Sequence, residues 1–140
     1  TINRAALANP TLIKLASREF GRQCIVVSID YEEFGEKRHL RVENQNMPNS
    51  NPREVVEWIL KVEELGAGEI LLNSVSRDGM KSGYDISFLG EVSDRIKIPV
   101  IACGGAGNWE HMAEVLSETN VDAVAAANIF HFRSKRISCT

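Results

Sequence analysis

The chain has 140 residues, a formal net charge of −3 and a composition of 44% hydrophobic and 25% charged residues, which is typical of a soluble globular domain. Its 19 acidic residues outnumber 16 basic ones and only 6% of residues are aromatic, which argues against nucleic-acid binding. No apolar run approaches the roughly 18 residues that a membrane span needs. Cys24, Cys103 and Cys139 form no C-x-x-C pair, which argues against disulfides and zinc. We therefore expect one cytoplasmic domain, residues 1–140, with neither membrane nor nucleic acid as a partner.

Amphipathic and apolar segments alternate along the chain. Asn9-Pro10 has the pattern of a helix start, with an N-cap followed by proline at the first helical position, and Asn51-Pro52 repeats it before a helix that we expect to stop at Gly66. Two further helices are predicted from the stripe Ile86, Leu89, Val92 and Ile96 and from the N-cap Asn108. The predicted strands are short apolar runs between the helices: Cys24–Asp30, Glu69–Val75, Pro99–Cys103 and Ala123–Ile129, of which the alanine-rich last run also suits a helix.

These strands are continuously apolar rather than alternating, which is typical of parallel strands buried on both faces. Strands that alternate with helices form right-handed βαβ units, so we expect an α/β fold with a parallel sheet. Four such strands fit either a small flavodoxin-like sheet or half of a (β/α)8 barrel, and composition does not choose between them. The stretch from Tyr31 to Ser50 is too long for a plain connection, and His39–Val42 is predicted to add a small hairpin there.

In either architecture ligands bind at the carboxyl ends of the strands, so the residues after each strand are candidates for function. The third predicted strand runs into the glycine-rich segment Gly104–Asn108, directly before a capped helix. Such a segment lets backbone amides approach an anion, which the helix N-terminus also favours, and it predicts a phosphate site. The alternative is a tight turn that needs glycine for positive φ angles.

Two carboxylates follow predicted strands in positions suited to acid/base work. Asp30 ends an apolar strand, where partial desolvation favours a general acid or base; the alternative is a loop residue paired with solvent or with Lys37. Asp78, followed by Gly79, either orients a ligand hydroxyl or transfers a proton, or it forms a simple Asp-Gly turn. Cys103 has no obvious base beside it, which favours a buried thiol over a nucleophile. The three histidines show no recurring ligand spacing, so no metal or other cofactor is predicted.

Three stretches, GAGEILLNSVSRDGMKSGYD, IPVIACGGAGNWEHM and DAVAAANIFHF, resemble the cyclase subunit family of imidazole glycerol phosphate synthase. INRAALANP and GRQCIVVSID are similar to the same family, so the resemblance extends over nearly the whole chain. The family fold is a TIM (β/α)8 barrel of about 250 residues, and the chain resembles only its C-terminal half, with residues 1–3 at the end of the fourth strand. The resemblance therefore implies a parallel (β/α) half-barrel of the last four strands, completed by oligomerisation or by a missing half.

The resemblance also implies a reaction and its partners. Ammonia from a glutaminase subunit and a bis-phosphorylated aminoimidazole carboxamide ribulosyl nucleotide would yield imidazole glycerol phosphate and an aminoimidazole carboxamide ribotide, in histidine biosynthesis and without a cofactor. One of the family's two acid/base carboxylates belongs to the first barrel strand, and the other matches Asp30; Asp78 is our second catalytic candidate. The residues expected to bind substrate phosphates are Asn3, Asp78, Gly79, Gly104, Gly105, Ala127 and Asn128.

Several positions depart from the family pattern. A small hydroxyl is usual where Asn73, Cys103 and Asn128 stand, an Asp is usual where Ser76 stands, and a lysine is usual in the segment after Asp30. These differences resemble a paralogous group that works with an amidotransferase to convert an acetamido group on a nucleotide-linked sugar to an acetamidino group for surface polysaccharide. A third alternative is a phosphate-binding half-barrel without catalysis.

Overall fold

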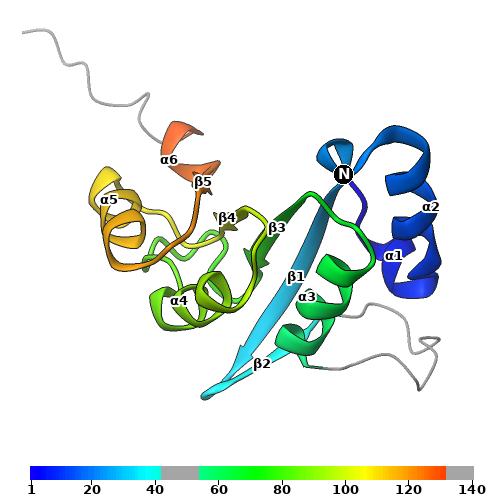
Figure 1. Ribbon diagram of the computed structural model, residues 1–140. Helices are drawn as coiled ribbons and strands as arrows, with labels where there is room; N and C mark the ends of the chain where they lie inside the picture. The colour runs from blue at the N-terminus through cyan, green and yellow to red at the C-terminus, as the bar shows by residue number, and fades with distance from the viewer. Residues whose placement is uncertain (42–53, 132–140) are drawn as a thin grey trace, which may run out of the picture.

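The computed structural model describes residues 1–41 and 54–131. One sheet has the strand order β2-β1-β3-β4-β5 and crosses the middle of the molecule (Figure 1). Its strands are β1 (Val26–Phe34), β2 (Lys37–Leu40), β3 (Glu69–Ser74), β4 (Val100–Cys103) and β5 (Ala123–Ala125). The helices are α1 (Arg4–Ala8), α2 (Thr11–Phe20), the 3₁₀ helix η1 (Arg22–Cys24), α3 (Val55–Glu64), α4 (Ile86–Arg95), α5 (Trp109–Glu118) and α6 (Asn128–His131).

Four strands run parallel and follow one another in chain order across the sheet. β1 pairs with β3, β3 with β4, and β4 with β5, each in parallel register. Helices α3, α4 and α5 make the connections between them. The predicted α/β fold with a parallel sheet is therefore confirmed.

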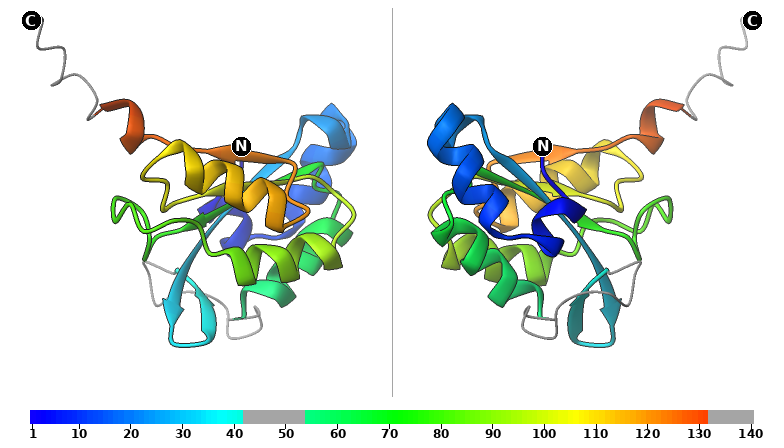
Figure 2. Two further views of the ribbon diagram at one scale, coloured as in Figure 1. Left: turned by 90° about the vertical axis from the view of Figure 1, so that its left-hand side faces the viewer. Right: turned by 90° about the vertical axis from the view of Figure 1, so that its right-hand side faces the viewer.

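The outer edge of β1 is covered by two different segments. Near its start, Ile2 makes a parallel bridge to Val27, in which the Ile2 amide donates to the Val26 carbonyl at 2.8 Å. Near its end, β2 pairs antiparallel with β1, from Tyr31 opposite Leu40 to Phe34 opposite Lys37. The predicted hairpin therefore exists, although it lies earlier than His39–Val42, and it projects beyond the helices (Figure 2).

Some predicted boundaries were wrong. The last strand stops at Ala125, because alanine has little preference for strands, and the end of the predicted run, from Asn128, belongs to α6. β1 continues to Phe34 because β2 pairs with its end. Pro10 takes the N-cap position of α2, one residue outside the expected place. Asn51-Pro52 lies outside the described residues, whereas the predicted stop at Gly66 is confirmed by its φ of +105° just after α3.

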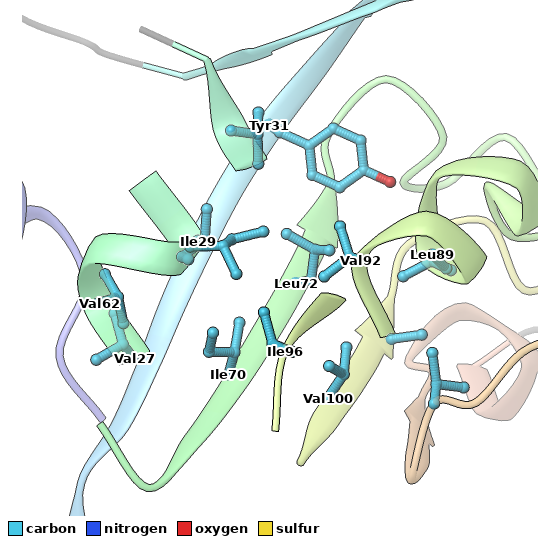
Figure 3. Packing of buried hydrophobic residues seen from close by; sticks show 14 of the residues in the cluster. Val27, Ile29, Tyr31, Val62, Ile70, Leu72, Leu89, Val92, Ile96 and Val100 are labelled. Carbon is cyan, nitrogen blue, oxygen red and sulfur yellow. The ribbon is translucent and has the colours of Figure 1, made fainter. Parts of the chain in front are cut away.

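The core lies between one face of the sheet and the helices. Along β1, Val27, Ile29 and Tyr31 are buried and alternate with half-buried residues. β3 and β4 repeat this alternation, which places Ile70, Leu72, Val100 and Ala102 on the same buried face. Side chains of α3 and α4, including Val62, Leu89 and Val92, pack against them (Figure 3). The same pattern leaves the other face of the sheet as a distinct surface.

That second face of the sheet is only partly covered. Val26 and Ser28 on β1, Leu71 on β3 and Ile101 on β4 are half-buried, in contrast to their fully buried neighbours along each strand. A closed barrel would bury this face in its interior. Within the described residues, none of the helices has the length and apolar character that crossing a membrane requires.

Candidate functional site

The candidate site is built on one row of residues across the carboxyl ends of the parallel strands. Asp30 on β1 is in register with Asn73 on β3, Asn73 with Cys103 on β4, and Cys103 with Ala125 on β5. Residues in register project from the same face of a sheet, and this face is the half-buried one. The row therefore presents a carboxylate, a carboxamide and a thiol side by side.

Two asparagines hold the Asp30 carboxylate from opposite sides. The Asn3 side chain donates through Nδ2 to Oδ2 of Asp30 at 3.0 Å, and the Asn73 side chain donates through Nδ2 to Oδ1 at 3.0 Å. Asn3 comes from the segment that pairs with the outer edge of β1, whereas Asn73 comes from the neighbouring strand β3. From the described residues, each carboxylate oxygen thus accepts one hydrogen bond, and the two bonds fix the plane of the group. The sequence predicts separate roles for Asn3 and Asp30 and does not show that their side chains pair.

Cys103 lies in the electrostatic field of both predicted catalytic carboxylates. Burial raises the pKa of its thiol above the ordinary value, and the negative charges of Asp78 and Asp30 raise it further. A raised pKa keeps the thiol protonated at neutral pH, which makes Cys103 a poor nucleophile. The influence of both charges on one thiol indicates that Asp30 and Asp78 border the same region.

The loop after β3 and the glycine-rich segment after β4 pack backbone against backbone. The amide of Gly83 donates to the carbonyl of Gly105 at 2.8 Å. Gly104 and Gly105 have φ angles of +92° and +108°, and a Cβ at either position would collide with a carbonyl oxygen, that of Ser74 or that of Gly83. The glycines are therefore required by the turn itself, whatever they bind.

The segment before α5 has already used part of its hydrogen-bonding capacity. The side chain of Asn108 accepts from the His111 amide at 2.9 Å, so the predicted N-cap is confirmed. The ring of His111 accepts in turn from the amide of Gly107 at 3.1 Å. Gly105 and Ala106 are buried, and within the described residues their amides donate to no acceptor. These two amides are the donors that the turn leaves for an anion.

The remaining predicted phosphate residues lie in the loops around this row. Asp78 and Gly79 are exposed in the turn after β3, where the Asp78 amide donates to the Ser74 carbonyl at 3.1 Å and Gly79 has a φ of +77°. Ala127 is exposed between β5 and α6. Asn128 begins α6, but its side chain lies outside the described part of the structure. Among the described residues, no hydrogen bond joins Asp78, Gly79 or Ala127 to Asp30, so their roles stay predictions.

A partly buried ion-pair network, which the sequence does not predict, centres on the buried Asp85 side chain. Arg38 on β2 donates to Asp85 through Nε at 2.6 Å and Nη2 at 3.1 Å. Arg77 donates through Nε to Glu33 at 2.6 Å, and its Nη2 lies 4.0 Å from Asp85. The network fastens the β1–β2 hairpin to the loop after β3. No local pattern could have predicted it, because the paired residues are 44 and 47 positions apart.

Tyrosine side chains extend this network toward the core and toward β5. Tyr31 donates to Asp85 at 3.3 Å, and burial together with the Asp85 charge raises the pKa of this phenol. Tyr84 donates to the carbonyl of Ala125 at 3.0 Å, and burial raises its pKa to about 12. Both phenols are therefore neutral donors at physiological pH. In the described part of the chain, no three His, Cys, Asp or Glu side chains are grouped as a metal site would need.

Comparison with known proteins places this arrangement in a family. A family model described as "Histidine biosynthesis protein" matches residues 1–136. The chain belongs to this histidine biosynthesis family. Imidazole glycerol phosphate synthase subunits HisF from Prosthecochloris aestuarii and Clostridium botulinum are 47% and 44% identical to it over 137 residues. The same subunit from Chlorobium phaeovibrioides is 44% identical over 137 residues.

Each alignment covers 98% of this chain but 54% of the relative, so the chain spans about half the length of the curated relatives that it matches. This coverage and the four consecutive parallel strands agree with the half-barrel that the resemblance implied. Of the two architectures that composition left open, the half-barrel of this histidine biosynthesis family is the one that the findings support.

Proposed function

We propose that this chain supplies the C-terminal half of an ammonia-dependent cyclase of the imidazole glycerol phosphate synthase type. The substrates would be ammonia and a bis-phosphorylated aminoimidazole carboxamide ribulosyl nucleotide. The observation that carries the proposal is the Asp30 carboxylate, which Asn3 and Asn73 hold at the carboxyl end of β1 on the half-buried face of the sheet. A carboxylate with a fixed plane beside a ligand is suited to general acid/base catalysis.

In this proposal Asp30 moves protons while the ring closes. Its two oxygens each accept only one hydrogen bond from the described residues, which leaves lone pairs for a proton on the attacking nitrogen or on a substrate hydroxyl. Asp78 would act at the other side of the same region, either on a substrate hydroxyl or as a second acid/base group. The field that both carboxylates exert on Cys103 supports this shared location.

Substrate phosphate would bind at the glycine turn. The buried amides of Gly105 and Ala106 lack acceptors among the described residues, and the N-terminus of α5 adds partial positive charge beside them. Gly79, Gly104, Ala127 and Asn128 belong to the same proposal, and Asn3 would contact the opposite phosphate. Backbone amides would then bind the phosphate at each end of a long substrate, which would lie across the row that begins with Asp30.

The test separates catalysis from binding. Asp30→Asn keeps the shape of the side chain, so we expect turnover to be abolished while affinity for a phosphate-bearing ligand stays within a few fold. An equal loss of affinity and turnover would mean that Asp30 binds substrate instead. The assay uses ammonium with each candidate substrate, and turnover of a nucleotide-linked acetamido sugar in place of the ribulosyl nucleotide would assign the paralogous amidinating function.

The proposed partners are a glutaminase that delivers ammonia and a second half-barrel, from another copy of this chain or from an N-terminal half. The half-buried side chains of Val26, Leu71 and Ile101 support a covering partner, because apolar sheet faces are seldom left in water. Light scattering at micromolar concentration tests this: a dimer or larger species supports self-association, and a monomer points to a separate half. The proposal includes the cytoplasm as location, since Cys24 and Cys103 are free thiols.

A further inference from the structure

We propose that Asn73 is a positioning residue for the Asp30 carboxylate, and that the chain keeps it at some cost in stability. This inference rests on the proposed function, in which Asp30 is the proton-moving group. It concerns a residue that sequence analysis noted only as a departure from the family pattern.

The Asn73 side chain contacts the Asp30 carboxylate directly. Asn73 and Asp30 are register neighbours on adjacent parallel strands, and Nδ2 of Asn73 donates to Oδ1 of Asp30 at 3.0 Å. With Asn3 on Oδ2, the two carboxamides determine the rotation of the carboxylate about its Cβ–Cγ bond. Loss of either donor would free that rotation. A general acid or base loses efficiency when its reacting oxygen is no longer held in line with the proton that it moves.

The Asp30 carboxylate also determines the orientation of the Asn73 amide. Its nitrogen must face Asp30, because the reversed amide would set an acceptor oxygen against a carboxylate oxygen. Its own oxygen, Oδ1, therefore points the other way, toward β4, where a Cβ at Gly104 would lie 3.2 Å from it. Gly104 has no side chain to donate to that oxygen. Oδ1 is buried, and within the described residues it accepts no hydrogen bond.

Asn73 lowers the stability of the fold at this position. A buried acceptor without a donor destabilises a folded protein, and the middle of a parallel sheet favours β-branched apolar residues. Both effects act against asparagine at position 73. The hydrogen bond to Asp30 is the interaction that this side chain gains in exchange. Residues that lower stability in this way are concentrated at functional sites.

The test is a pair of variants with the same shape. Asn73→Thr carries a hydroxyl that can donate to Asp30, whereas Asn73→Val carries a methyl group in its place. We expect kcat of Asn73→Val to be at least about 10-fold below that of Asn73→Thr, with KM for the phosphorylated substrate within a few fold in both, because the glycine turn is unchanged. We expect the melting temperature of Asn73→Val to equal or exceed that of the parent.

The control is Asn120→Ser, measured in the same assembly. Asn120 precedes β5, at the opposite end of the sheet, and its exposed side chain donates to Asp94 at 2.7 Å. This variant should leave both kcat and KM unchanged. If Asn73→Thr and Asn73→Val have equal kcat, or if Asn73→Val melts below the parent, the carboxamide has a structural role and the inference is overturned.

The failures of the two proposals can be told apart. If the parent chain in its assembly consumes none of the candidate substrates, the proposed function is refuted. The positioning role of Asn73 rests on that function and is then refuted with it. In an active parent, a lower melting temperature of Asn73→Val, or equal kcat values of Asn73→Val and Asn73→Thr, overturn the inference alone.

Discussion

Asp85→Asn is expected to destabilise this fold more than any surface charge change of the same kind. The Asp85 side chain is 3% exposed and accepts from Arg38 at 2.6 and 3.1 Å and from Tyr31 at 3.3 Å. Arg77 Nη2 also lies 4.0 Å from Oδ1 of Asp85. Asparagine keeps the shape of the side chain but removes its charge, so Arg38 is left beside a neutral amide and over the Phe88 ring, 5.7 Å from its centroid.

The magnitude follows from the burial of the partners. Removing one member of a buried ion pair costs about 3–5 kcal/mol because an uncompensated charge stays behind. The Arg38 side chain is 13% exposed and can turn toward water, which favours the lower end, about 3 kcal/mol. Total stabilities of single domains are about 5–15 kcal/mol. A loss of this size should lower the melting temperature by roughly 10 °C in a chain of this length.

Urea unfolding followed by circular dichroism measures the loss of free energy of unfolding. The comparison holds if parent and variant have the same slope of this free energy against urea concentration. Glu91→Gln is the matched control, since Glu91 pairs with Arg95 at 3.1 Å while both side chains are about half exposed. That variant should change stability by less than about 0.5 kcal/mol. Equal losses in the two variants would refute the argument that burial gives the Asp85 pair its importance.

Two further predictions concern the turn and the phenols. Gly105→Ala should lower the free energy of unfolding by about 3 kcal/mol or more, because its Cβ would collide with the Gly83 carbonyl. Gly35→Ala has a φ of +61° and open space around it, so it should lower that free energy by only about 1 kcal/mol. Urea unfolding compares the two variants, and similar losses would contradict the packing of the two loops. Burial raises the pKa of Tyr84 from 10.0 to about 12, so the stability contributed by the neutral phenol is fully present below pH 10 and is lost as pH rises toward 12. The free energy of unfolding of Tyr84→Phe should therefore fall less steeply with pH across this window than that of the parent. Parallel pH profiles would contradict the raised pKa of Tyr84.

The expectations that held are those that depend on neighbouring residues in the sequence. The apolar runs became β1, β3 and β4, and the stripe from Ile86 to Ile96 became α4 with its buried face inward. Asn108 caps α5 as predicted. The period of hydrophobic residues and a cap three residues from its donor are local properties, so they can be read without knowing the fold.

Local reading failed where two states compete or where a partner is distant. The alanine-rich run suits a helix as well as a strand: β5 has three residues, Ala126 and Ala127 belong to neither element, and the run ends in α6. A hairpin near His39 and a strand end at residues 1–3 were expected, but their places along the edge of β1 were not: Ile2 bridges to Val27, and β2 pairs with Tyr31 to Phe34. Edge pairing depends on what lies beside the strand in space, and sequence periodicity does not contain that information.

The sequence by itself determined the segment order, the glycine turn and the presence of Asp30 and Asn3 among the candidates. Only the tertiary structure decided that Asn3, 27 residues before Asp30, and Asn73, 43 residues after it, donate to the same carboxylate. Strand register makes that choice, since a shift of one residue would turn Asn73 to the opposite face of the sheet. The site exists because backbone hydrogen bonds between the strands determine which distant residues are in register and lie side by side on one face of the sheet.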